Sequence, residues 1–137
     1  DLKPDNIMID KNKTLVLVDF DRMVDINFAE NKSSIDFSNI YTPKEVNDGI
    51  YSFSCDIYSL GKVIYYIIEG KDLTNENLLN YNKNSIFEIV KKCINEKAEK
   101  RPLITDLILD FYILYQIILY QMIHQELEAL YGQLSRF

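Results

Sequence analysis

The hydrophobic and polar positions divide the chain into a short β-rich beginning and a mainly helical remainder. Two apolar runs, residues 7–10 and 14–18, flank a polar turn at 11–13, and their composition predicts a β-hairpin. The near end of this hairpin carries Asn6 and its far end carries Asp19. Because a hairpin returns on itself, we expect these two polar side chains to lie close enough to bind one metal cluster.

Capping signals and apolar runs predict helices in the middle of the chain. Asp56 precedes an apolar segment, residues 57–68, and Gly70 follows it, so we expect Asp56 to be the N-cap and Gly70 to terminate the helix. The segment is apolar almost all round, which predicts burial on most sides. Residues 85–94 form the next predicted helix, which a capping-box pattern at its start supports.

The C-terminal part of the chain predicts one long helix. Pro102 is expected in its first turn, and within 103–134 only Gly132 is a helix breaker. The most apolar part, residues 111–123, is shorter than the about twenty residues of a membrane span. We therefore favour either a buried helix or a helix that binds a partner or a second copy through 103–134. Its second half continues a heptad-like stripe: Ile123, Leu127, Leu130 and Leu134.

Three stretches between these elements lack a sustained period. Residues 21–44 are rich in Asn, Asp, Ser and Lys, which predicts a mobile loop. Residues 71–84 are polar, with a short helix expected at about 76–79, and residues 95–100 are a predicted charged loop.

Composition narrows the class of protein. A length of 137 residues with 47% apolar content supports one hydrophobic core rather than two independent domains. The net charge of −6 argues against a nucleic-acid partner, which would require a basic face. Cys55 and Cys93 form no CxxC pattern and no secretory signal is visible, so we expect a reduced, cytoplasmic protein, with membrane association as the lesser expectation. His124 lacks a Cys or second His partner for a zinc site.

The first six residues, Asp1-Leu2-Lys3-Pro4-Asp5-Asn6, and Asp19 together suit phosphoryl transfer. One carboxylate can orient an attacking hydroxyl and accept its proton, while an amide oxygen and a second carboxylate can hold the divalent ions that bridge nucleotide phosphates. The same carboxylates could also serve metal-dependent phosphate hydrolysis without a protein substrate, which is a minor alternative.

The order of motifs over roughly the first 110 residues resembles the C-terminal lobe of eukaryotic protein kinases of the serine/threonine type. The motifs after the opening string are Asp19-Phe20-Asp21, Pro43-Lys44-Glu45, Asp56-Ile57-Tyr58-Ser59-Leu60-Gly61 and Arg101-Pro102. The resemblance implies a mainly α fold with a short β-hairpin. It also implies a partial kinase domain at 1–110 without an N-lobe, a helical extension at 111–137, the cofactors ATP and Mg²⁺, and a protein substrate.

The resemblance also implies roles for individual residues of the site. Asp1 matches the catalytic base, and Lys3 matches the lysine that steadies the γ-phosphate in kinases acting on Ser and Thr hydroxyls. Asn6 and Asp19 match the two magnesium ligands. Candidate phosphosites, for which an ordinary solvated hydroxyl is an equal alternative, are Ser33, Ser34 and Thr42.

Three further residues match structural positions of the family. Glu45 corresponds to the acid of the segment that closes the activation loop, and Arg101 to its partner in a bidentate, partly buried ion pair. Asp56 corresponds to the acid that heads the central helix and braces the catalytic loop through backbone amides.

Departures from the family pattern leave two interpretations of function. Asp21 stands where the family has glycine, Lys44 where it has proline, and Tyr58 where tryptophan is more usual. No glycine cluster matches the phosphate loop of an N-lobe. The protein is either an active serine/threonine kinase in its full-length context or a pseudokinase or truncated lobe that serves as a non-catalytic interaction module. We expect the 137-residue chain alone to show no turnover.

Overall fold

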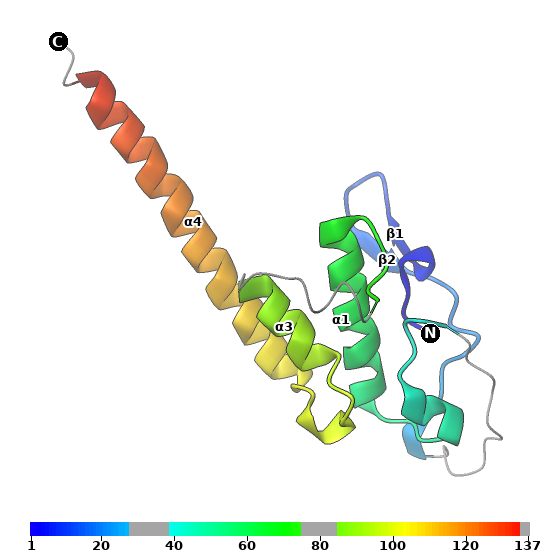
Figure 1. Ribbon diagram of the computed structural model, residues 1–137. Helices are drawn as coiled ribbons and strands as arrows, with labels where there is room; N and C mark the ends of the chain where they lie inside the picture. Colours follow the sequence, from blue (N-terminus) through cyan, green and yellow to red (C-terminus); the bar gives the residue numbers. More distant parts are fainter. Residues whose placement is uncertain (28–38, 75–84, 135–137) are drawn as a thin grey trace. The chain divides into compact units, whose positions relative to one another are not determined.

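The computed structural model of the chain describes residues 1–27, 39–74 and 85–134 (Figure 1). The chain divides into two compact units, Asp1–Leu103 and Ile104–Phe137. The described part is mostly helical with one two-stranded antiparallel sheet, as the sequence predicted. The helix expected at about 76–79 and residues 28–38 of the expected mobile loop lie outside the described residues.

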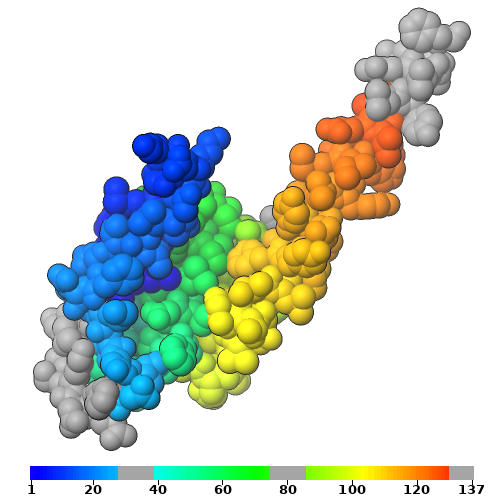
Figure 2. Space-filling view, turned by 180° about the vertical axis from the view of Figure 1, so that it is seen from behind, coloured from blue at the N-terminus to red at the C-terminus, as the bar shows by residue number. Residues whose placement is uncertain are grey.

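A β-hairpin forms at the beginning of the chain, which confirms the prediction. Strand β1 (Ile7–Ile9) pairs antiparallel with β2 (Leu15–Leu17). The turn between them is closed by the Asp10 carboxylate, whose Oδ1 accepts the backbone N–H groups of Asn12 and Thr14, each at 2.8 Å. Such side-chain-to-backbone bonds are the reason that aspartate favours turns. Both views show the hairpin beside helix α1 (Figures 1 and 2).

Helices α1 (Phe53–Glu69) and α3 (Ser85–Cys93) form the core of the first unit. Tyr65 of α1 packs edge-on against Phe87 of α3, with ring centroids 6.0 Å apart. Leu73 and Val90 complete this buried cluster. The burial of Tyr65, Phe87 and Val90 removes apolar surface of both helices from water.

Helix α1 differs from its prediction at the start and in the burial of its last turn. Ser52, in extended conformation, is the N-cap residue, so the prediction of Asp56 as the N-cap is wrong and Asp56 lies in the first turn. Gly70 ends the helix in the left-handed region (φ 65°), as expected. Ile67 is 70% exposed, and Tyr66 and Ile68 are also exposed in the described part of the chain, so the predicted burial on most sides is wrong in the last turn.

The predicted helix at 85–94 is present as α3, and a single 3₁₀ turn, η4 (Ala98–Lys100), lies in the predicted charged loop. Helix α4 (Ile104–Leu134) begins two residues after Pro102, which is therefore not in its first turn. Arg101, the residue before the proline, is extended (φ −73°, ψ 144°), as a residue in this position prefers to be. As predicted, α4 is one long helix, and Gly132 does not interrupt it.

Helix α4 contains a segment of the kind that can cross a membrane. Its residues 104–129 form 26 continuous helical positions, within which an 18-residue stretch has a mean hydropathy of 1.4. Length and composition alone do not distinguish a membrane span from a helix that pairs with another protein.

A glycine sets the close approach of α1 and α3. A Cβ added at Gly61 would lie 2.5 Å from the Cβ of Cys93 and 3.0 Å from Cγ2 of Ile94. We therefore expect Gly61→Ala to destabilise the fold by about 1–3 kcal/mol through overpacking. Helix propensity alone predicts the opposite, a gain of about 1 kcal/mol.

Urea unfolding of the natural gene product that contains this chain measures the change in the free energy of unfolding caused by Gly61→Ala. Gly70→Ala is the comparison, because an added Cβ there meets no atom within 4 Å and the only penalty is the positive φ. An unchanged or raised midpoint for Gly61→Ala would contradict the close packing.

Candidate functional site

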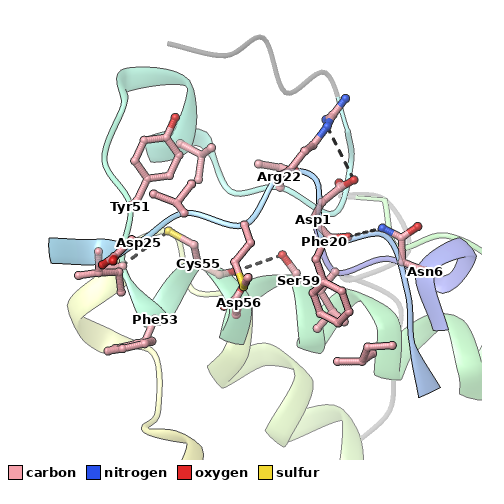
Figure 3. A pocket seen from close by; sticks show the side chains of 18 of the residues that line it. Asp1, Asn6, Phe20, Arg22, Asp25, Tyr51, Phe53, Cys55, Asp56 and Ser59 are labelled. Carbon is pink, nitrogen blue, oxygen red and sulfur yellow. Dashed lines mark hydrogen bonds and ion pairs between the residues drawn. The ribbon is translucent and has the colours of Figure 1, made fainter. Parts of the chain in front are cut away.

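The Asp1 carboxylate is nearly buried and faces two cations. Its side chain is 5% exposed, and Oδ2 lies 2.9 Å from Lys3 Nζ and 3.9 Å from Arg22 Nε. The Asn6 side chain, which is buried, donates from Nδ2 to the Asp1 carbonyl at 2.9 Å. Figure 3 shows Asp1, Asn6 and Arg22 together on one wall of a cavity. The structure thus brings Asp1, Lys3 and Asn6 together, as the sequence predicted.

The local fold of residues 3–6 explains this geometry. Pro4–Asn6 form a 3₁₀ turn, η1, in which the Asn6 N–H donates to the Lys3 carbonyl at 3.0 Å. The turn folds the chain back, so that the side chains of Lys3 and Asn6 both reach Asp1. Proline suits the first position of such a turn because its fixed φ is helical and it has no N–H to satisfy.

The hairpin carries Asp19 to the same cavity. Val18 N–H donates to the Asn6 carbonyl at 3.0 Å, which joins the end of β2 to the start of β1. Asp19 follows with φ 62°, a left-handed conformation that is uncommon outside glycine and is often found at functional sites. Asp1, Asn6 and Asp19 all line one cavity of about 610 Å³.

The donor set of Asn6 and Asp19 fits a hard divalent cation. Asn6 uses its amide nitrogen on the Asp1 carbonyl, which leaves Oδ1 as the atom that can face a cation. Asp19 is exposed and supplies a carboxylate. Amide and carboxylate oxygens are the ligands that Mg²⁺ takes, usually with water and substrate phosphates completing the shell. Within the described residues no group of three or more His, Cys, Asp or Glu side chains could hold a metal ion.

Glu45 and Arg101 form the bidentate ion pair that the sequence analysis expected. Arg101 donates from Nη1 to Glu45 Oε1, and from Nη2 to Oε2 at 3.2 Å. The Arg101 side chain is 1% exposed and that of Glu45 17%. Burial alone would raise the pKa of Glu45, but the bonds and charge of Arg101 and a backbone N–H together hold it below its ordinary value.

Arg101 has three further contacts that the sequence did not reveal. Its Nε donates to the Asn95 carbonyl at 2.8 Å, and Nη1 donates to the Ser54 carbonyl at 3.1 Å. Its guanidinium lies 4.9 Å from the ring centroid of Tyr58. The aromatic residue at position 58 thus has a stacking role that tyrosine fulfils. Arg101 therefore ties the 3₁₀ helix η3 (Lys44–Asp48) to the start of α1 and to the loop after α3.

Asp56 is not placed as the sequence suggested. It is exposed in the first turn of α1 and lines the cavity (Figure 3), and no hydrogen bond of the described residues joins its carboxylate to the backbone of residues 1–6. Thr42 is half-buried in a turn closed by its N–H and the Asn39 carbonyl at 3.0 Å. Ser33 and Ser34 lie outside the described residues.

Two side chains near Asp1 were missed from the sequence. Arg22 is a single cation within an acidic stretch, and this pattern could have indicated that it pairs with a carboxylate such as that of Asp1. Asn39 donates from Nδ2 to Asp1 Oδ1 at 3.4 Å. No periodicity marks its segment, so nothing local placed it beside residue 1.

An acid held by a lysine two residues on, with an amide and a second acid at one cavity, is the arrangement expected in a kinase-like protein. The chain matches the protein kinase domain family over residues 1–118, and it belongs to this family.

Three relatives illustrate the range of the similarity. The probable serine/threonine-protein kinase gdt8 of Dictyostelium discoideum is 26% identical over 92% of this chain and 11% of its own length. Integrin-linked protein kinase 1 of Arabidopsis thaliana is 28% identical over 80% of this chain and 29% of its own length. Serine/threonine-protein kinase PKH1 of Saccharomyces cerevisiae is 28% identical over 52% of this chain and 11% of its own length. The chain therefore spans only 11% to 29% of these relatives.

Proposed function

We propose that this chain carries the catalytic loop of an ATP-dependent protein serine/threonine kinase, which transfers the γ-phosphate of ATP to Ser and Thr hydroxyls of proteins in its full-length context. The observation that carries the proposal is the nearly buried Asp1 carboxylate, bonded to Lys3 and backed by Asn6. The serine/threonine kinases among the relatives support the same acceptor class.

The residues divide the chemistry among them. The Asp1 carboxylate orients the substrate hydroxyl and accepts its proton as the oxygen attacks. The Lys3 ammonium, 2.9 Å from Asp1, places a positive charge beside the transferred group. Asn6 and Asp19 would hold Mg²⁺, which when bound neutralises phosphate charge. Lys3 and Arg22 also keep the Asp1 side chain in one position, so little reorganisation is needed at reaction.

The test is phosphotransfer by the natural gene product that contains this chain. With ATP and Mg²⁺, we expect label to enter a peptide library whose acceptors are Ser and Thr, and not a matched library whose acceptor is Tyr. Absence of transfer to the Ser/Thr library would refute the proposal, and transfer to the Tyr library alone would refute the acceptor class.

A non-catalytic interaction module is the second candidate, and the exposed apolar side chains of α4 favour it. Residues Tyr120, Met122 and Leu127 are among the large exposed apolar residues of this helix. In water such a helix gains from pairing with another. Deletion of residues 119–137, which lie beyond the family match, should then abolish self-association in light scattering and leave phosphotransfer unchanged. Unchanged association after the deletion would remove this candidate.

A further inference from the structure

The turn at residues 39–42 holds a side chain against the proposed catalytic base. Asn39 donates from Nδ2 to Asp1 Oδ1 at 3.4 Å. Its own Oδ1 accepts the Tyr41 N–H at 3.0 Å, and its carbonyl accepts the Thr42 N–H at 3.0 Å. These two bonds fix the orientation of Asn39 within the turn. The contact with Asp1 is long for a hydrogen bond, so it depends closely on where the turn lies.

Tyr41 anchors this turn to the rest of the first unit. Its side chain is almost buried, and its carbonyl accepts a hydrogen bond from Ser59 Oγ of α1 at 2.8 Å. Its hydroxyl donates to Asp72 Oδ1 at 2.5 Å. Burial, the hydrogen bond to Asp72 and the charge of Asp72 together raise the pKa of Tyr41 well above its ordinary value of 10.0, so the hydroxyl remains a donor at neutral pH.

The acceptor of that bond is itself held on α1. Lys62, only 9% exposed, donates from Nζ to the Leu73 carbonyl at 3.0 Å. Burial lowers the pKa of Lys62, and the nearby charge of Asp72 opposes this shift. Leu73 belongs to the buried core cluster with Tyr65 and Phe87. Leu73 is thus fixed against α1, and Asp72, the residue before it, offers its carboxylate from this fixed position.

We infer that Tyr41 and Asp72 are positioning residues for Asp1: their hydrogen bond fixes the turn at 39–42 on α1, and Asn39 then restrains the Asp1 carboxylate. The inference rests on the proposed function, because Asp1 is the catalytic base only if the protein is a kinase. The effect of Tyr41 and Asp72 is transmitted through Asn39, and a shift of about 1 Å in the base is enough to slow a reaction strongly.

Backbone amide exchange in the natural gene product tests the structural part without reference to activity. Tyr41→Phe and Asp72→Ala should each accelerate exchange at the backbone N–H groups of positions 41 and 42 by about tenfold, the usual net value of one hydrogen bond. Asp72→Asn keeps an acceptor oxygen and should stay close to wild type. Asp48→Ala, which removes another exposed carboxylate of the first unit, is the matched control and should change nothing there.

Steady-state kinetics test the positioning part. Tyr41→Phe and Asp72→Ala should lower kcat by about tenfold with KM for ATP unchanged, and the double variant should be no slower than either single variant. Asp72→Asn should restore most of the rate. Unchanged amide exchange in both single variants would show that the Tyr41–Asp72 hydrogen bond does not fix the turn. Faster exchange with unchanged kcat would show that the turn does not position Asp1. A wild type without transfer would refute the proposed function and with it the catalytic role, while the exchange experiment would still decide whether the tie exists.

Discussion

Asp1→Asn should lower phosphotransfer by about 10² to 10⁴-fold while nucleotide binding stays close to wild type, because an amide cannot accept the proton of the attacking hydroxyl. The change is nearly isosteric, and the amide oxygen can still accept the hydrogen bond that Lys3 Nζ now gives to the carboxylate. The loss should therefore appear in kcat and not in the affinity for ATP. Single-turnover transfer to a Ser/Thr peptide and fluorescent-nucleotide binding measure the two quantities separately.

The same loop offers a matched control for this experiment. Asp5 lies in η1, four residues from Asp1, and is exposed where the Asp1 side chain is nearly buried. Asp5→Asn removes the same charge from the same loop without changing the proposed base, and it should keep wild-type kcat. An equal loss in both variants would show that the site responds to net charge, and full activity of Asp1→Asn would exclude Asp1 as the base.

The parts of the site that the sequence predicted are those with a local cause. The hairpin follows from two apolar runs and a turn residue, Asp10, and it brings Asn6 and Asp19 to one cavity without any distant contact. The end of α1 at Gly70 likewise has a local cause, a left-handed residue that glycine adopts without strain. The pairing of Glu45 with Arg101 spans 56 positions, and only the family resemblance suggested it.

The parts that were missed depend on distant segments. Asn39 reaches Asp1 across 38 positions, and Tyr41 reaches Asp72 across 31. Neither pair has a periodicity or motif that indicates it. One signal was available: Lys62 is a single charged residue inside an apolar helical segment, and such a residue needs a buried acceptor.

The start of α1 was misjudged because Asp56 is as good a cap by type as Ser52, and only the backbone conformation of Ser52 decides between them.

Glu45→Ala should destabilise the first unit by about 3–5 kcal/mol, because it leaves the Arg101 guanidinium buried without its counter-charge. Arg101→Lys should also be costly, since one ammonium cannot replace a planar fork that reaches Glu45 and the Ser54 and Asn95 carbonyls. Urea unfolding of the natural gene product measures both losses. The neighbouring pair of Lys44 and Glu96, which is highly exposed with N and O 3.5 Å apart, is the matched control. Lys44→Ala should change stability by less than about 0.5 kcal/mol.

The stabilisation by the Glu45–Arg101 pair should decrease in acid, because the environment of Glu45 lowers its pKa. The pKa of Glu45 is lower in the folded protein than its ordinary value of 4.5, so the folded state binds fewer protons than the unfolded state as the pH falls through this range. The stabilisation by the pair is therefore complete above about pH 4.5 and is lost as the pH falls through the folded-state pKa. Glu45→Gln does not titrate at this position, so its stability deficit against wild type should be full at neutral pH and shrink in acid. A deficit that stayed constant down to low pH would mean that the carboxylate charge is not what holds Arg101 in place.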